Sequence, residues 1–171
     1  MAISNHERVG KALGLLKEGL RPFVEREMKS KHDKFWEAEM EEILSDTRLG
    51  DGKGDALGDV AAQLVIIDRQ WGKVFNRTLG KAERSLVNET LDVRRRWAHQ
   101  EPFSSDDADR ALDSMARLLN SVSAPEADEV GKMKMELRRQ IYDQQVRGEK
   151  RKSSVTAIES GVTNTLKSWR E

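Results

Sequence analysis

One pair of residues in this sequence has the chemistry of a phosphodiester site. Arg94 and His99 lie five residues apart in the run Arg94-Arg95-Arg96-Trp97-Ala98-His99. A guanidinium binds phosphate through a planar fork of N–H donors. An imidazole accepts and donates protons near neutral pH. Such a pair also arises by chance in helical proteins, so its meaning depends on the elements that position it.

The helix that carries the pair places the arginine on an apolar face. Gly80 and Pro102 bracket a predicted helix from about Lys81 to His99, because the residue before a proline avoids helical geometry. At 100° per residue, Arg94 falls in the middle of an apolar stripe. A buried guanidinium is costly unless it is paired or meets an anion. The stripe consists of Leu86, Val87, Thr90, Leu91, Val93, Trp97 and Ala98.

A simpler interpretation of this segment stays open. Arg94 can reach an edge of a bundle and extend to solvent. Arg95 and Arg96 can pair with Asp92, and His99 is a favourable cation at the end of a helix. The polar residues that would support the pair are Asn88, Glu89, Arg95 and Arg96.

The composition limits the classes of function. Of 171 residues, 35% are charged, yet 30 basic residues balance 30 acidic ones. The chain has no overall field that would attract nucleic acid or a membrane, so any RNA contact must be local. There is no cysteine, no apolar run of membrane-spanning length and no signal peptide, so we expect a cytoplasmic protein without membrane contact. We expect no metal and no cofactor.

The periodicity predicts an all-α antiparallel bundle of four core helices with short accessory helices. Ser4 and Glu7 form an expected capping box, and a stripe from Val9 to Phe23 follows, with a kink or break expected at Gly19 and Pro22. Further helices are expected at about 33–44, after an Asp55 cap, from Ser104, and from a Ser123–Glu126 capping box. The Gly-rich segment 50–55 fits neither a phosphate loop nor a calcium loop.

The pattern changes near Gly148. We expect a helical domain at residues 1–147, and a linker or the start of a missing C-terminal domain at 148–171. A tryptophan at position 169, so near the end, suggests the N-terminal piece of a longer protein.

The segment from Asn88 to Gln100 resembles the signature of HEPN domains, which are helical bundles with an Arg, four to six residues, and a His. The resemblance covers roughly residues 4–125. Within the HEPN domains, it is to the Swt-type branch. It includes the opening Asn5-His6-Glu7-Arg8-Val9-Gly10, Trp71 and Phe75 before the motif helix, and Pro102-Phe103-Ser104-Ser105-Asp106-Asp107 after it.

The resemblance implies a metal-independent endoribonuclease that works as a homodimer, with the two motif helices facing each other. Arg94 would hold the scissile phosphate and His99 would exchange a proton with the 2′-OH or the leaving oxygen. Bacterial domains of this kind often precede an ATPase in phage defence, and the tail from Leu166 to Glu171 resembles the entry to such an ATPase. One departure is Arg95, where the family usually has a polar residue, often Asn.

Two hypotheses follow. The first is a dimeric endoribonuclease or RNA-binding domain in phage defence, with Arg94 and His99 as its catalytic residues. The second is a catalytically inactive dimerisation or interaction module that regulates an attached ATPase. The intact Arg94–His99 pair favours the first, and Arg95 together with the neutral charge favours the second.

Overall fold

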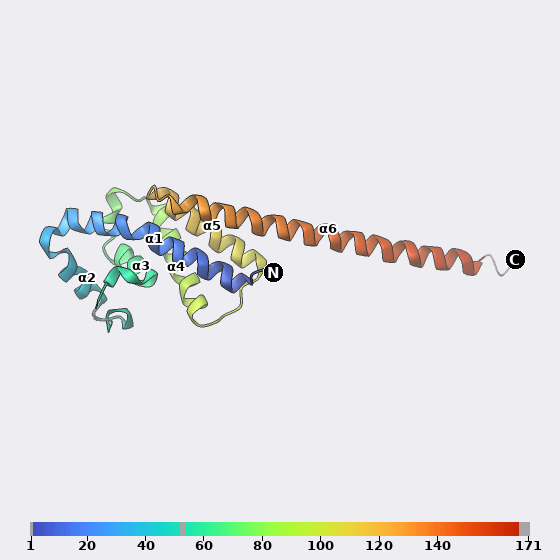
Figure 1. Ribbon diagram of the computed structural model, residues 1–171, viewed down its shortest axis with the longest axis horizontal. Helices are drawn as coiled ribbons and strands as arrows, with labels where there is room; N and C mark the ends of the chain where they lie inside the picture. The colour runs from blue at the N-terminus through green and yellow to red at the C-terminus, as the bar shows by residue number, and fades with distance from the viewer. Residues whose placement is uncertain (1, 52–53, 168–171) are drawn as a thin grey trace. The chain divides into compact units, whose positions relative to one another are not determined.

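The computed structural model describes residues 2–51 and 54–167, and only the backbone at 50–51 and 160–167. Gly52 and Lys53 of the expected loop, and Ser168 to Glu171 of the tail, lie outside these residues. The described part of the chain is helical and contains no strand (Figure 1). Its elements are α1 (Asn5–His32), η1 (Asp33–Phe35), α2 (Trp36–Leu44), η2 (Arg48–Asp51), η3 (Ala56–Gly58), α3 (Val60–Arg69), η4 (Phe75–Arg77), α4 (Lys81–Ala98), α5 (Ser105–Ser121) and α6 (Glu126–Lys167).

Local signals set the beginnings of two long helices. The Ser4 hydroxyl accepts from the Glu7 amide, and the Glu7 carboxylate accepts from the Ser4 amide, so the predicted capping box of α1 is confirmed. Ser104 and Asp107 form the same arrangement at α5. The stripe predicted for α1 is buried throughout, at Val9, Leu13, Leu16, Leu20 and Phe23.

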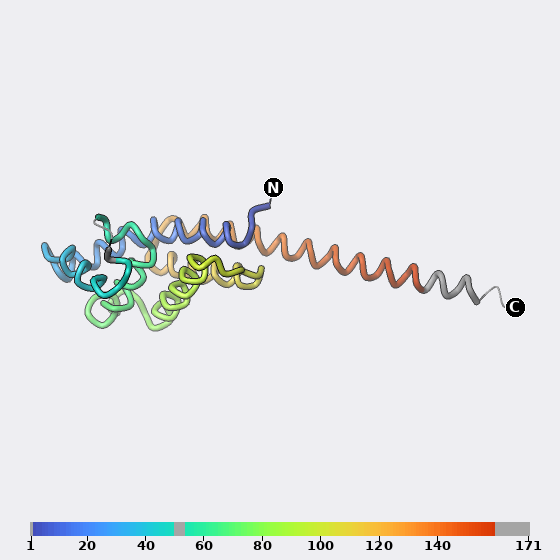
Figure 2. The backbone as a smooth tube through the Cα atoms, turned by 90° about the horizontal axis from the view of Figure 1, so that it is seen from below, coloured from blue at the N-terminus to red at the C-terminus, as the bar shows by residue number. Residues whose placement is uncertain are grey.

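Four helices make the core. α5 packs against α1 and α4, and α3 packs against the same two helices from the other side. Figures 1 and 2 show α1 and α5 lying side by side. The predicted all-α bundle of four core helices with shorter accessory ones is confirmed. It is filled by large side chains that include Leu16, Met28, Ile67, Phe75 and Met115.

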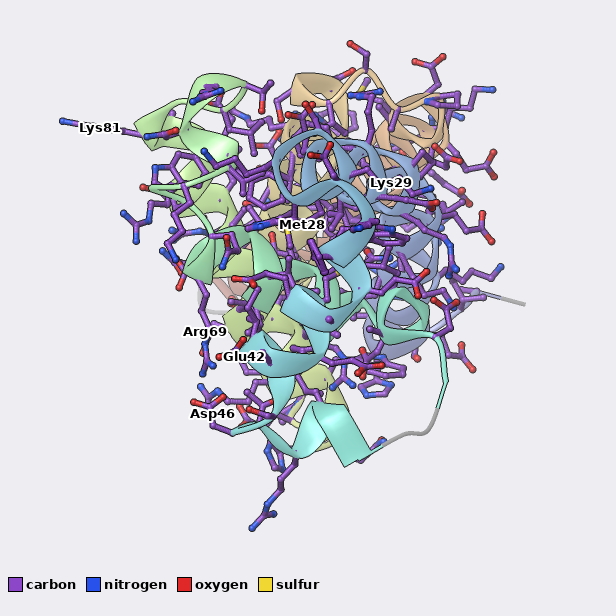
Figure 3. The ribbon with its side chains drawn as sticks, turned by 90° about the vertical axis from the view of Figure 1, so that its left-hand side faces the viewer. Met28, Lys29, Glu42, Asp46, Arg69 and Lys81 are labelled. Carbon is purple, nitrogen blue, oxygen red and sulfur yellow. The ribbon has the colours of Figure 1, made fainter. Side chains whose placement is uncertain are left out.

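The short helix α2 packs on α1 and α3. The Arg69 guanidinium at the end of α3 bonds the Ile43 carbonyl, at 2.8 Å, and the Asp46 carboxylate, at 2.5 Å. Figure 3 shows Arg69 and Asp46 next to each other, and Met28, which is buried, nearer the middle of the view. Phe35, the last residue of η1, is 64% exposed.

Three local predictions were wrong in detail. α1 continues through Pro22 without a break, because the apolar stripe stays buried both before and after it, and the expected kink stays a prediction. Asp55 caps the 3-10 helix η3, while Asp59 caps α3. Ser123 has φ of +57° after the end of α5, and α6 begins only at Glu126, so the predicted Ser123–Glu126 capping box does not start that helix.

The contacts divide the chain into residues 1–134 and residues 135–171. α6 is helical through Gly148, where the sequence predicts an interruption, because a single glycine costs only about 1 kcal/mol in a helix. Tyr142, Val155 and Ile158 in the second unit are exposed. The domain boundary expected between residues 147 and 148 stays a prediction. None of the described helices is both long and apolar enough to cross a bilayer.

Candidate functional site

The motif helix α4 ends where the sequence predicts. The Gly80 amide donates to the Glu83 carboxylate at its beginning. At its end, the His99 amide donates to the Arg95 carbonyl, and Gln100 has φ of +57°, a left-handed conformation that terminates helices. His99 is therefore the C-cap residue, beside the negative end of the helix dipole.

Arg94 lies at the edge of the buried stripe of α4. Val87, Thr90 and Val93 are buried, whereas Ala98, predicted inside, is exposed. The Arg94 side chain is 23% exposed, so the sequence-based placement in the middle of the stripe was too deep.

Among the described residues, Asp59 and Trp97 lie beside the Arg94 guanidinium. Its Nη2 lies 3.5 Å from Oδ2 of Asp59, the N-cap residue of α3. Its central carbon lies 6.0 Å from the centre of the Trp97 ring, at the outer limit of a cation–π contact. The arginine is thus paired by a neighbouring helix.

A surface depression of about 480 Å³ brings four of the predicted site residues together. Arg94 and His99 both line it, although five residues at 100° each separate them by about 140° around the axis of α4. The depression lies where α4 meets α3 and the residues after α2, and it is open to solvent. Polar lining comes from Asn88, Asp92, Arg94, Arg95 and His99, and apolar lining from Leu49, Ala61, Val65, Leu91 and Ala98.

Arg95 is held by Asp92 on the same helix, with Nη2 and Oδ1 2.5 Å apart. This hydrogen bond is the main reason that the pKa of Arg95 is raised. Both side chains are exposed, so the pair is weak and can exchange for another anion. The predicted Arg95–Asp92 ion pair is present, while Arg96 has other partners.

Arg96 and Glu89 do not line the depression. Arg96 turns toward the start of α5, where it bonds the Pro102 carbonyl, at 3.1 Å, and the Asp107 carboxylate, at 3.3 Å. Glu89 accepts a hydrogen bond from Arg110 of α5. Both therefore tie α4 to α5 and are not placed to support Arg94 directly.

Asp107 belongs to this α4–α5 junction. The Ser104 amide donates to its carboxylate, and Arg96 donates to it as well. Chiefly the first of these bonds, then the second, lowers the pKa of Asp107. The Arg96 guanidinium also lies 4.7 Å from the centre of the Phe103 ring. This cluster fixes the loop that follows His99.

The last turn of α4 is anchored on α1 through Trp97. Trp97 Nε1 donates to the His6 carbonyl at 3.1 Å, and His6 Nε2 lies 3.0 Å from the Trp97 carbonyl. The two rings stack 5.4 Å apart at 14°. A Cβ on Gly10 would lie only 2.8 Å from Trp97 Nε1. Only a glycine at position 10 leaves room for the indole in this place.

Residues 11–123 match the family described as Swt1-like HEPN. The chain belongs to the Swt1-like HEPN family. HEPN domains in general are ribonucleases or nucleotide-binding domains. No curated protein and no solved structure matches the chain. The family match lies within the span of about 4–125 over which the sequence resembles these domains.

Two residues that contact α4 beside the candidate site of this HEPN domain are not predicted from the sequence. Asp59 was not considered, although an aspartate directly before an apolar helical run is a recognisable N-cap. The sequence gives His6 no role beyond its place in the opening segment, yet it is half-buried against Trp97. No sequence pattern joins positions 6 and 97, since only the packing of α1 on α4 brings them together.

The donor set of this HEPN domain suits an anion. Two guanidiniums, an amide and an imidazole line the depression, with one carboxylate that already pairs with Arg95. Within the described residues there is no cluster of three side chains that could hold a metal ion. Arg94 can bind a phosphate oxygen, and His99 can exchange a proton with a neighbouring oxygen.

Proposed function

We propose that this HEPN domain is a metal-independent endoribonuclease that acts as a homodimer. The observation that carries the proposal is the convergence of Arg94 and His99 on one open depression. Asn88 and Arg95 line the same depression, which supports their assignment to RNA binding. Glu89 and Arg96 act through the α4–α5 junction.

The proposed reaction uses the ribose of RNA as its nucleophile. The 2′-oxygen attacks the adjacent phosphorus, the bond from phosphorus to the 5′-oxygen breaks, and a cyclic phosphate and a free 5′-hydroxyl result. The 2′-hydroxyl loses one proton and the leaving 5′-oxygen gains one. His99 is assigned to one of these transfers, and Arg94 to stabilising the negative charge on phosphate.

A second copy of the chain is proposed to cover the depression. Leu91 is half-buried and Ala98 is exposed there, and Leu49 and Val65 add apolar surface beside them. Burial of apolar surface is the main driving force of association. In a symmetric dimer the two copies of His99 would approach a shared cleft, so that one could accept a proton while the other donates one.

The biological setting is proposed from the resemblance to bacterial domains. Those domains precede an ATPase in phage-defence systems, and we propose the same role here, with cytoplasmic RNA as the target. Because the chain is neutral overall, recognition of RNA would depend on the local Arg94 and Arg95 cluster and on the second copy.

Cleavage of RNA by the wild-type protein, in the presence of a chelator, tests the proposal. His99→Ala removes an exposed side chain, so the variant should stay folded while cleavage falls by at least about a hundredfold, as expected for general acid–base catalysis. His32→Ala is the matched control, because His32 lies far along α1 and contacts Gln70. Equal cleavage by wild type and His99→Ala would refute the assignment.

A second candidate function is an inactive dimerisation module that regulates an attached ATPase. It is favoured by the ion pairs that each arginine of the motif already makes. Arg94 pairs with Asp59, Arg95 with Asp92 and Arg96 with Asp107. Sedimentation measured beside the cleavage assay separates the two functions. A wild-type protein that is dimeric and leaves RNA intact at high concentration would support this candidate and refute the ribonuclease.

A further inference from the structure

The two carboxylate oxygens of Asp59 make different contacts, one a hydrogen bond and the other an ion pair. Its Oδ1 accepts from the Ala61 amide at 2.9 Å, which caps α3. Its Oδ2 lies 3.5 Å from Nη2 of Arg94. The cap fixes the carboxylate on the rigid end of α3, and the second oxygen is thereby presented to the arginine of the motif helix. α3 and α4 are thus linked by a side chain whose rotamer is already set.

The carboxylate contacts Arg94 from beside the depression. Arg94 is among the described residues that line the depression, whereas Asp59 is not. A single contact of 3.5 Å to one terminal nitrogen leaves the other N–H groups of the fork available to an anion. The centre of the Trp97 ring lies 6.0 Å from the central carbon of the guanidinium and also limits where the guanidinium can move. This arrangement orients the fork without filling the place that a phosphate would take.

The neighbouring pair behaves differently. Asp92 lies within the lining and bonds Arg95 at 2.5 Å, so a phosphate in the depression would compete with it. Both members of that pair are more than half exposed, whereas the Arg94 side chain is 23% and that of Asp59 40% exposed. Of the two arginines in the depression, Arg94 is the one held in place from outside it.

We propose that Asp59 is a positioning residue for Arg94, which fixes the guanidinium for the scissile phosphate. This inference rests on the proposed ribonuclease function. A long arginine side chain has several rotamers, and their restriction before substrate binds reduces the loss of entropy on binding. Displacement of a catalytic group by about 1 Å can cost up to about a hundredfold in rate.

The test is Asp59→Asn compared with Asp55→Asn. Asparagine retains an oxygen that can cap α3, and Asn and Asp are equivalent as N-caps, so only the charge facing Arg94 is lost. Asp55 is a matched control, because it also caps a helix, η3, and also pairs with an arginine, Arg21, outside the depression. We expect kcat/KM for RNA cleavage to fall on the order of tenfold in Asp59→Asn and to stay within about twofold in Asp55→Asn.

A double-mutant cycle separates positioning from a purely structural role. RNA affinity is measured for Arg94→Ala with and without Asp59→Asn. If Asp59 acts through Arg94, the second substitution has no further effect in the Arg94→Ala background. An equal loss in both backgrounds would overturn the inference, and so would increased affinity in Asp59→Asn alone, since that would make the carboxylate a competitor of phosphate.

A measurement without RNA keeps this test independent of the proposed function. The Nε–H of Arg94, assigned by its loss in Arg94→Lys, should exchange with solvent several-fold faster in Asp59→Asn and at the wild-type rate in Asp55→Asn. If the wild type does not cleave or bind RNA, the ribonuclease proposal fails, and the exchange rate still decides whether Asp59 restrains Arg94. An unchanged rate in Asp59→Asn overturns the inference.

Discussion

Replacement of Gly10 by alanine tests how tightly α1 holds the end of the motif helix. A Cβ at this position would lie 2.8 Å from Nε1 of Trp97 and 3.1 Å from two of its ring carbons. Carbon atoms in van der Waals contact prefer about 3.5–4.0 Å, so the indole must move by about 0.7 Å. That displacement lengthens the bond from Nε1 to the His6 carbonyl, now 3.1 Å.

The free energy of unfolding should fall in Gly10→Ala. The forced displacement of a packed side chain costs about 1–3 kcal/mol, and loss of the hydrogen bond costs about 1 kcal/mol more. Against this, alanine is better than glycine inside a helix by about 0.5–1 kcal/mol. The net expectation is a destabilisation of about 1–3 kcal/mol.

Gly14→Ala is the matched control. Gly14 lies one helical turn further along α1, is exposed, and has no neighbour that a Cβ would meet within 4 Å. Only the gain in helix propensity applies there, so this variant should be stabilised by about 0.5–1 kcal/mol. For a chain of this length, about 1 kcal/mol shifts Tm by roughly 2–4 °C, so the two variants should differ by at least about 3 °C.

Thermal unfolding followed by circular dichroism measures this difference. The indole N–H signal of Trp97, assigned by substitution, should also shift in Gly10→Ala and remain in place in Gly14→Ala. If Gly10→Ala is as stable as Gly14→Ala and its indole signal is unmoved, the close contact between α1 and Trp97 is wrong. Trp97 would then not be the residue that holds the end of α4 on α1.

Two further predictions concern other parts of the fold. Pro22→Ala should raise the urea midpoint of unfolding by an amount equivalent to about 1–3 kcal/mol. The reason is that an exposed proline inside the continuous helix α1 removes one backbone hydrogen bond. A lower midpoint would contradict the continuous helix. The lowered pKa of Asp107 means that its stabilising contribution is present above the ordinary carboxyl pKa of about 3.9 and is lost as the pH falls through the lowered value. Asp107→Asn should therefore be less stable than wild type at pH 6, and the difference in Tm between the two proteins should shrink between pH 4 and pH 2. A difference in Tm that does not depend on pH would contradict the ionised Arg96–Asp107 contact.

Short-range signals in the sequence were sufficient for most of the fold. The beginnings of α1 and α5 follow from hydrogen bonds between residues three apart, and the buried stripe of α1 follows from the 3.6-residue period. Errors arose where one residue was given too much weight. Pro22 and Gly148 lower local helix propensity, but propensity is a small term beside the hydrogen bonds of a long helix, and both helices continue through them.

Only part of the candidate site could be predicted from the sequence. Arg94, His99, Asn88 and Arg95 were named from the sequence, and they line one depression. Their spacing along α4 did not reveal that arrangement, because a helical wheel contains no information on which neighbouring helices cover each side of α4. Which side of α4 stays open depends on the packing of α3 against it.

The sequence by itself determined the helical class, the apolar and polar faces of each helix and the residue types at the site. These depend on interactions within a turn or two of the chain. The tertiary structure alone decided which carboxylate faces each arginine and what holds Trp97. Asp59 is 35 positions before Arg94, and His6 is 91 positions before Trp97. Contacts at such separations follow from how whole helices pack, and that depends on the combined fit of many side chains.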